Sequence, residues 1–297
     1  MTLLAHLSDV HLGPLPPVSL RELASKRAFG YLNWTGNRAR IHDSDVLAAI
    51  TDDLRASNPD HIAVTGDLVN LGIDAEYDRA LDWLATLGGP ADVTVVPGNH
   101  DAYVRQAIAR YSETWSPYAS GDEPDAEHPY PFIRRRGPLA LIGLSTAVAT
   151  APLMATGRID EDQAHELGKI LAAAGREGLC RVVLIHHPPV KGAASWHRRL
   201  VGAELVRHAI ARFGAELVLH GHNHVTSIAY LPGPDGREVP VVGAAAPSIV
   251  PHGRHPGAAY NLLRIEGDSG AYAIGMVERG FRDGRVETVA AHRLDRQ

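Results

Sequence analysis

The sequence predicts an α/β fold in which central strands are covered by helices. Up to His224, short apolar runs alternate with longer amphipathic segments, which is the pattern of strands followed by helices. After His224 the chain changes to short strands separated by Gly, Pro and Asp turns. The 297 residues are 45% hydrophobic, enough for a sizeable core. No linker separates two domains, so we expect one domain over residues 1–297, with a β-rich portion from residue 225.

Apolar runs bounded by turn residues define the expected strands. They lie at 3–7, 61–65, 93–96, 132–135, 139–144, 181–185 and 217–219, and then at 227–231, 239–243, 260–265 and 271–277. The last group suggests antiparallel meanders. A Pro-rich and acidic stretch at 117–131 reads as a surface loop.

Helical periodicity and capping residues define the expected helices. A first helix begins at a cap formed by Asp43 or Ser44, and others lie at 74–87, 102–114, 160–174 and 203–213. Asp160 is the expected cap of the fourth, with Gln163 as its capping-box partner. The apolar residues expected on the buried faces are Val46, Leu47, Ile50 and Leu54 in the first helix, and Tyr77, Leu81 and Leu84 in the second.

Composition limits the environment and the partners. The net charge of -5 gives no general basic field, so we predict no nucleic-acid partner. A single cysteine, Cys180, cannot form an internal disulfide, which indicates a reducing compartment. No apolar run approaches a membrane span, and the first residues lack the basic start of a signal peptide. We therefore expect a cytoplasmic protein whose oligomeric state the sequence leaves open.

Polar side chains follow five of the predicted strands at the point where each strand ends. The blocks are Ser8-Asp9-Val10-His11, Gly66-Asp67, Gly98-Asn99-His100-Asp101, His186-His187 and His220-Gly221-His222-Asn223-His224. Ligands bind outside the carboxyl ends of strands in open α/β sheets, so these blocks should converge. Each block alone can be an ordinary turn or a buried polar residue. Five such blocks together favour one shared site.

The side chains in these blocks predict a metal centre. Carboxylates, imidazoles and one amide, without a thiolate, suit Mn, Fe, Zn, Co or Ni. Seven such ligands are too many for one ion and suit two ions that share a carboxylate at about 3.5–4 Å separation. Two divalent cations neutralise the charge of a phosphoryl group and make hydroxide available near neutral pH. Phosphoester hydrolysis is the expected reaction class.

In order along the chain, the five blocks resemble the complete signature of the calcineurin-like metallophosphoesterases. The resemblance implies a four-layer α/β-β/α sandwich that holds two divalent metals, for which Mn, Fe and Zn are the candidates. It implies that one metal is bound by Asp9, His11 and His224, the other by Asn99, His186 and His222, and that Asp67 bridges them. His187 is left as a supporting or substrate contact.

The resemblance also implies two catalytic residues. His100 would face the phosphate and stabilise or protonate the leaving oxygen, and Asp101 would orient its imidazole.

The stretches LVNLGIDAEYDRALDWLATL and HHPP are most similar to the bacterial branch that contains class III cyclic-nucleotide phosphodiesterases and glycerophosphodiesterases. The branch implies attack of a metal-activated hydroxide on the phosphodiester of a small anionic substrate. The alternative is a phosphomonoesterase or pyrophosphatase acting on a nucleotide or nucleotide-sugar. A catalytically silent scaffold is less favoured, since every signature position is filled.

Residues 14–42 form an insertion that is longer than we expect for this branch. It contains the basic residues Arg21, Lys26, Arg27, Arg38 and Arg40 and the apolar residues Phe29, Tyr31, Leu32 and Trp34. It is either a solvated basic helix followed by a loop, or a cap that supplies cations and aromatic faces to an anionic substrate. As an interfacial helix it would bring phospholipid head groups to the site, an alternative we do not favour. Other candidate wall residues are Trp196, His197, Arg198, Arg199, His252, Arg254 and His255.

Overall fold

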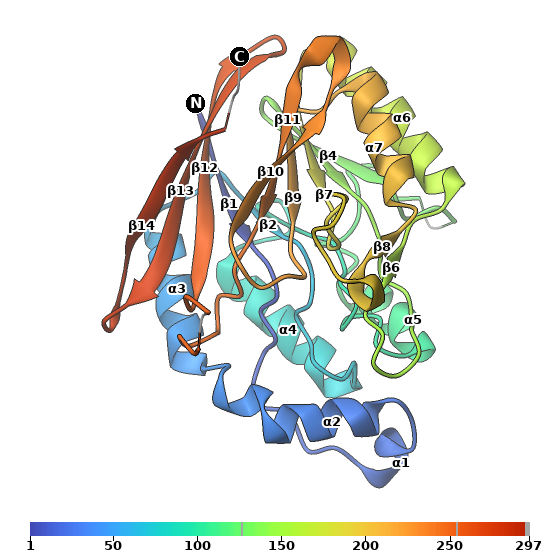
Figure 1. The fold of residues 1–297 in the computed structure, drawn as a ribbon, viewed down its shortest axis with the longest axis vertical. Coiled ribbons are helices and arrows are strands. Elements are labelled where there is room, and N and C mark those ends of the chain that lie inside the picture. Colours follow the sequence, from blue (N-terminus) through green and yellow to red (C-terminus); the bar gives the residue numbers. More distant parts are fainter. Residues whose placement is uncertain (126, 254, 295–297) are drawn as a thin grey trace.

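Two six-stranded sheets face each other at the centre of the computed structural model, which describes residues 1–125, 127–253 and 255–294 (Figure 1). The first sheet contains, in spatial order, β14 (Arg285–Arg293), β13 (Ala271–Arg282), β12 (Ala259–Asp268), β1 (Thr2–Leu7), β2 (His61–Val64) and β3 (Val93–Val95). The second contains β10 (Ser227–Pro232), β11 (Glu238–Gly243), β9 (Leu217–His220), β7 (Cys180–Leu184), β5 (Leu139–Gly143) and β4 (Phe132–Arg136). The short strands β6 (Gly157–Arg158) and β8 (Leu200–Val201) pair separately.

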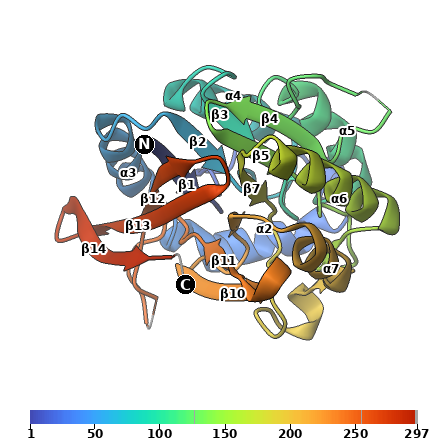
Figure 2. The ribbon, with the colours of Figure 1, turned by 90° about the horizontal axis from the view of Figure 1, so that it is seen from above.

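Helices form the two outer layers. The helices α3 (Ser44–Ala56), α4 (Asp74–Leu87) and α5 (Arg105–Thr114) share one apolar cluster with the first sheet. The helices α6 (Glu161–Arg176) and α7 (Ala203–Phe213) share another with the second sheet, as the view from above shows (Figure 2). The order helix, sheet, sheet, helix confirms the predicted four-layer sandwich.

A third apolar cluster fills the space between the two sheets. On β7, Val182 and Leu184 belong to this inner cluster, whereas Val183 packs under the helices of the second sheet. Successive side chains of a strand point to opposite faces, so a strand covered on both sides reads as one continuous apolar run. Leu4 and Ala5 of β1 divide between the two faces in the same way.

The predicted caps are present, with one correction. The side chain of Asp43 accepts hydrogen bonds from the backbone of Asp45 and Val46, and that of Asp160 accepts one from Gln163 N at 2.9 Å. The capping box predicted at Gln163 is wrong. Its side-chain amide instead bonds both backbone groups of Ser145, at 2.9 and 3.0 Å. It therefore fastens α6 to the loop that follows β5.

Two predictions for the C-terminal portion need correction. Strand β11 pairs parallel to β9 as well as antiparallel to β10, so this portion is not purely antiparallel. Strand β14 was not predicted, and β13 runs beyond residue 277 to Arg282. Asp283 and Gly284 join them with φ of 48° and 82°, as in a two-residue hairpin of the Asp-Gly type. The Asp-Gly pair was the sequence signal that could have revealed this hairpin.

The insertion at 14–42 lies across the end of the molecule at which β1 and β2 finish (Figure 1). It forms α1 (Leu20–Leu23), α2 (Arg27–Gly36) and the 3-10 helix η1 (Arg38–Arg40). The segment therefore contains more helical structure than the single basic helix and loop considered from the sequence. Arg27 Nε donates to Leu71 O at 3.0 Å, and Lys26 Nζ donates to Thr150 Oγ1 at 2.8 Å. These contacts hold the segment against the loops beside the strand ends.

Two further 3-10 helices, η2 (Trp196–Arg198) and η3 (Pro234–Gly236), lie in connections of the second half. Helix α5 begins three residues later than the predicted 102, because residues 101–104 still follow the turn after β3. Within the described ranges, no helix combines the length and the apolar character needed to cross a membrane.

Candidate metal centre

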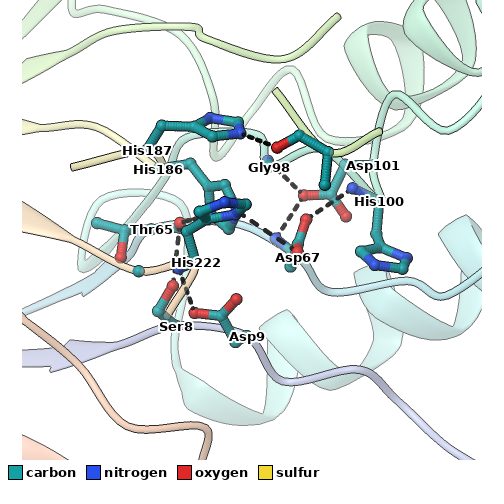
Figure 3. A network of polar contacts seen from close by, with 12 residues as sticks. Ser8, Asp9, Thr65, Asp67, Gly98, His100, Asp101, His186, His187 and His222 are labelled. Carbon is teal, nitrogen blue, oxygen red and sulfur yellow. Dashed lines mark hydrogen bonds and ion pairs between the residues drawn. The ribbon is translucent and has the colours of Figure 1, made fainter. Parts of the chain in front are cut away.

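The carboxyl ends of five strands bring the predicted ligands together. These are β1, β2 and β3 of the first sheet and β7 and β9 of the second. Residues that follow them, such as Asp9, Asp67 and His186, lie close together in Figure 3. Six of the seven predicted ligands are buried, and His224 is partly buried. The site is therefore assembled in the gap between two sheets, from residues up to 215 positions apart (His224 − Asp9).

The backbone is in the left-handed region at five of the seven predicted ligands. These residues are Asp9, His11, Asp67, His222 and His224, with φ between 46° and 71°. A non-glycine residue in this region costs energy and persists where its surroundings fix it, most often at functional sites. The bends turn these side chains from the strand ends into the gap.

Asp9, His11, Asp67 and His224 form the first group of potential ligands, with ligating atoms within 4.8 Å of one another. His224 Nε2 lies 3.2 Å from Asp9 Oδ1 and 3.4 Å from His11 Nε2. Since His11 Nδ1 donates to the carbonyl of Val69 at 3.2 Å, its Nε2 is the atom with a free lone pair. Four potential ligands therefore point at one position.

The second group lies on the other side of Asp67. His186 Nε2 is 3.4 Å from Asp67 Oδ2, and its Nδ1 donates to Thr65 O at 2.6 Å, which leaves Nε2 available. His222 donates from Nε2 to Arg198 O at 2.8 Å, so its Nδ1 is the available atom. Asn99 is also buried, and it lines the cavity that opens over both groups and is described below.

His187 lies within reach of this second group, but its ring is already engaged. Its Nδ1 is 2.7 Å from Thr146 Oγ1 and its Nε2 is 3.2 Å from Ala155 O. A neutral imidazole has one donor and one acceptor nitrogen, and both are used here. This geometry favours His186 as the ligand and His187 as a residue that supports the wall.

Three buried polar atoms make the site fit for cations. Asp9 Oδ1, Asn99 Oδ1 and His186 Nε2 have no hydrogen-bond partner among the described residues. Buried polar atoms are normally satisfied, so orphans gathered at one place call for a ligand. All three are oxygen or nitrogen donors, and the only thiol, Cys180, is buried between the sheets. The residues thus fit N/O-coordinated divalent metals.

The electrostatics show the same demand for positive charge. Burial raises the pKa of Asp67, but His186, His100 and His11 outweigh it, so that the pKa falls well below its usual value. Burial lowers the pKa of His186, yet the carboxylates of Asp67 and Asp9 raise it to about 9. A proton on His186 and a cation compete for the same nitrogen, and either neutralises the buried carboxylates.

The predicted partner of His100 is wrong. Asp101 does not hydrogen-bond to the imidazole, because its two oxygens accept backbone N–H groups. The donors are Asp67 and Gly98 at 2.8 Å, Leu68 at 2.9 Å and Val69 at 3.2 Å. His100 Nδ1 donates instead to Asn70 O at 2.7 Å, which orients the ring and leaves Nε2 toward the cavity. Asp101 therefore shapes the backbone that carries Asp67.

A cavity of about 360 Å³ opens over these residues. Its lining includes Asp67, Asn99, His100, His222 and His224, together with Arg38, Arg198, His252 and His255. Burial, and then the neighbouring Arg38, lower the pKa of His100 to about 4, so its imidazole is neutral at neutral pH.

The structure sorts the wall residues that the sequence suggested. Of the four at 196–199 only Arg198 lines this cavity, whereas Trp196 is 68% exposed beside Arg199. His252 and His255 line it, and Arg254 lies outside the described residues. The apolar side chains expected of the cap do not line it, and Trp34 is buried against His42.

The calcineurin-like phosphoesterase family matches residues 2–226, about three quarters of the chain. The chain therefore belongs to this family, and its fold and donor set are those of a metal-dependent phosphoester hydrolase.

Two curated relatives are phosphodiesterases by name. The chain is 28% identical over 228 residues to a probable cyclic nucleotide phosphodiesterase of Synechococcus. The matched region covers 75% of this chain and 74% of the relative. It is 26% identical over 188 residues to the glycerophosphodiester phosphodiesterase GpdQ of Enterobacter lignolyticus, covering 63% and 57%.

Solved structures share the fold at lower identity. A dimetal phosphatase from Danio rerio is 13% identical with a TM-score of 0.65, and the match covers 99% of this chain and 98% of that one. The purple acid phosphatase PPD1 of yellow lupin is also 13% identical, with a TM-score of 0.61 over 99% of this chain and 53% of that one.

Proposed function

We propose that the protein hydrolyses phosphodiesters at a dinuclear centre. Asp9, His11 and His224 would hold one divalent cation, Asn99, His186 and His222 would hold the other, and Asp67 would bridge them. One observation carries the proposal: Asp67 Oδ2 lies 3.8 Å from His11 Nε2 and 3.4 Å from His186 Nε2, between the two groups. When bound, Mn, Fe or Zn would supply positive charge to a phosphoryl group and activate water.

The protein's own residues perform the remaining tasks. His100 presents Nε2 to the cavity while Asn70 O accepts from its Nδ1–H, so Nε2 is the atom that would take up a proton and pass it to the leaving oxygen. Asn99 is a neutral ligand, which adds no negative charge where an anionic phosphate binds. Asp101 holds the loop that carries Asp67 through its hydrogen bonds to the backbone.

We propose a small anionic phosphoester as the substrate. The two curated relatives are named for hydrolysis of phosphodiesters, and this supports a diester over a monoester. The alternative is a phosphomonoester or a pyrophosphate in a nucleotide or nucleotide-sugar. One observation favours this alternative: two guanidinium groups, from Arg38 and Arg198, line the cavity and suit a substrate with an additional negative charge.

Hydrolysis of bis(4-nitrophenyl) phosphate and of 4-nitrophenyl phosphate tests the proposal, with enzyme loaded with Mn, Fe or Zn. We expect a higher kcat/KM for the diester. We also expect Asp67→Asn to lose metal and to lower kcat/KM at least about 100-fold, beyond the 10- to 100-fold typical of groups that only support a ligand. The exposed Asp82 of α4 provides a matched control, Asp82→Asn, that should leave both unchanged.

A preference for the monoester would select the alternative. No hydrolysis of either ester by fully loaded protein would support the silent scaffold.

A further inference from the structure

The insertion at 14–42 places one cation, Arg38, on the lining of the cavity. Arg38 lies on η1 and is partly buried. Its Nη1 donates to His100 Nε2 at 3.2 Å, and its Nη2 donates to His11 Nε2 at 3.3 Å. The described part of the chain provides no carboxylate within 4.0 Å of this guanidinium. In the described chain, the direct side-chain partners of Arg38 are therefore these two imidazole nitrogens.

This arrangement suits the binding of an anion at Arg38. No carboxylate of the described residues contacts this partly buried cation directly, although Asp67 and Asp9 attract its charge from farther away. A guanidinium carries five N–H donors on three nitrogen atoms, and the contacts to His100 and His11 engage Nη1 and Nη2. His11 Nε2 is also the atom proposed to bind a cation, and one lone pair cannot serve both. Metal binding would therefore free donors of Arg38 beside His100.

A second guanidinium lies on the lining of the same cavity. Arg198 Nη2 donates to the carbonyl of His222, and Arg198 O accepts from the ring of His222. Arg198 is thereby tied to the second group of ligands, whereas Arg38 touches the first group and His100. Guanidinium groups bind phosphate oxygens through paired N–H donors, which gives direction as well as charge.

We propose that Arg38 is a substrate-binding residue that holds an anionic oxygen of the phosphoester beside His100. Its charge favours substrates with a second negative charge close to the reacting phosphorus, such as two linked phosphoryl groups. This preference for a substrate class rests on the phosphoester hydrolysis of the proposed function and points to its pyrophosphate alternative, whereas the binding of phosphate by Arg38 does not depend on turnover.

The test compares wild type with Arg38→Ala, Arg38→Lys and Arg40→Ala. Arg40 lies on the same 3-10 helix, is exposed and does not line the cavity, which makes it a matched control. Titration calorimetry measures the Kd of inorganic pyrophosphate for Mn-loaded protein. Steady-state kinetics compare a nucleoside diphosphate sugar with bis(4-nitrophenyl) phosphate, and elemental analysis gives the bound metal.

We expect Arg38→Ala to weaken pyrophosphate binding about 10-fold or more, as the loss of one charge-assisted contact predicts. Its KM should rise more for the diphosphate sugar than for the monoanionic diester, at unchanged metal content. Arg38→Lys should recover part of the affinity because it keeps the charge but not the fork. Arg40→Ala should match wild type.

Equal pyrophosphate affinity of wild type and Arg38→Ala would overturn the proposal, and so would loss of metal from Arg38→Ala, which would make Arg38 a support of the metal centre. If Arg38→Ala fails to fold, Arg38→Gln replaces it with similar volume and the same readouts. Failure of every variant and of wild type to hydrolyse any ester would defeat the proposed function, yet the calorimetry would still decide the role of Arg38.

Discussion

At the scale of single residues, we expect His100 to serve turnover and not metal binding. Its ring lines the cavity but is held by Asn70 O rather than by a ligand residue. We predict that His100→Asn keeps the metal content of wild type and lowers kcat about 100-fold, the lower end of what a positioned acid–base group contributes. Elemental analysis and kcat for the diester measure the two effects. A variant that loses its metal, or that turns over like wild type, would contradict this role.

Gly98 determines how closely two loops approach. A Cβ atom at this position would lie 2.2 Å from Asp67 Oδ1 and 2.6 Å from Asp67 N, so one of them must move. We predict that Gly98→Ala weakens metal binding 10- to 100-fold, on the order found when groups that position a ligand are lost. Metal titration measures this.

Gly89 offers a matched control for that substitution, because a Cβ atom there would meet its nearest neighbour only at 3.8 Å. If Gly89→Ala and Gly98→Ala bind metal equally well, the close approach does not govern the site.

Ligand types could be predicted at this scale, but their supports could not. The blocks ending in Asp, Asn and His indicated which side chains gather at the strand ends, and the structure brings them together. The carbonyl of Asn70 that orients His100 carries no signal in the sequence, since every residue has a carbonyl group. Proximity of Asp101 in the sequence suggested the wrong partner, because the turn after β3 points its side chain at backbone N–H groups.

At the scale of secondary structure, the strongest predictions came from periodicity and caps. Helix α3 buries all four residues expected on its inner face. Helix α1 is only four residues long, and β6 and β8 only two each, so no period can be recognised in them. Strands β6 and β8 exist because they pair with each other, whereas α1 is closed by a capping box between Ser19 and Glu22.

Strand β2 carries a buried histidine that makes stability depend on pH. His61 is 1% exposed and its Nε2 is 2.7 Å from Thr94 Oγ1. Burial, and then Arg136 and Arg134, lower its pKa from 6.5 to about 3. Below pH 6.5 the unfolded chain binds a proton that the folded chain does not, so the stabilising contribution of His61 is complete above pH 6.5 and is lost as the pH falls toward 3.

We predict that His61→Gln reduces the acid sensitivity of the unfolding free energy by about 2 kcal/mol between pH 7.5 and 5.0, the linkage effect of one such histidine. Urea unfolding of wild type and variant at both pH values measures the difference. Equal pH dependence in the two proteins would show that His61 does not titrate in this way. Glutamine retains an amide that can bond Thr94, which limits unrelated effects on stability.

At the scale of the whole molecule, the candidate metal ligands join the two sheets. Asp67 follows a strand of the first sheet and His186 a strand of the second, and His222 N donates to Asp9 Oδ2 across the same gap at 2.8 Å. Divalent cations bound there would stabilise the folded state, since the ligands come together only on folding.

We predict that removal of metal with a chelator lowers the Tm by roughly 5 °C or more. A ligand present at about 100 times its Kd stabilises the folded state by about 2.7 kcal/mol, which corresponds to a shift of this size. Added Mn should restore the Tm of wild type and should raise that of Asp67→Asn much less. Differential scanning fluorimetry measures both. The same Tm with and without metal would argue against a cation between the sheets.

The sequence by itself determined the donor types and the local structure: which strands end in candidate ligands, which helix faces are apolar, and that the donors are the oxygen and nitrogen atoms that suit divalent metals. These features are readable because periodicity and residue type act over a few neighbouring positions. The tertiary structure decided how the pieces meet. It placed the five strand ends on two facing sheets and brought Arg38 from the insertion to the lining of the cavity. It also made the carbonyl of Asn70, and not Asp101, the hydrogen-bond partner of the His100 ring. Such contacts join residues tens to hundreds of positions apart, and only the folded path of the chain defines them.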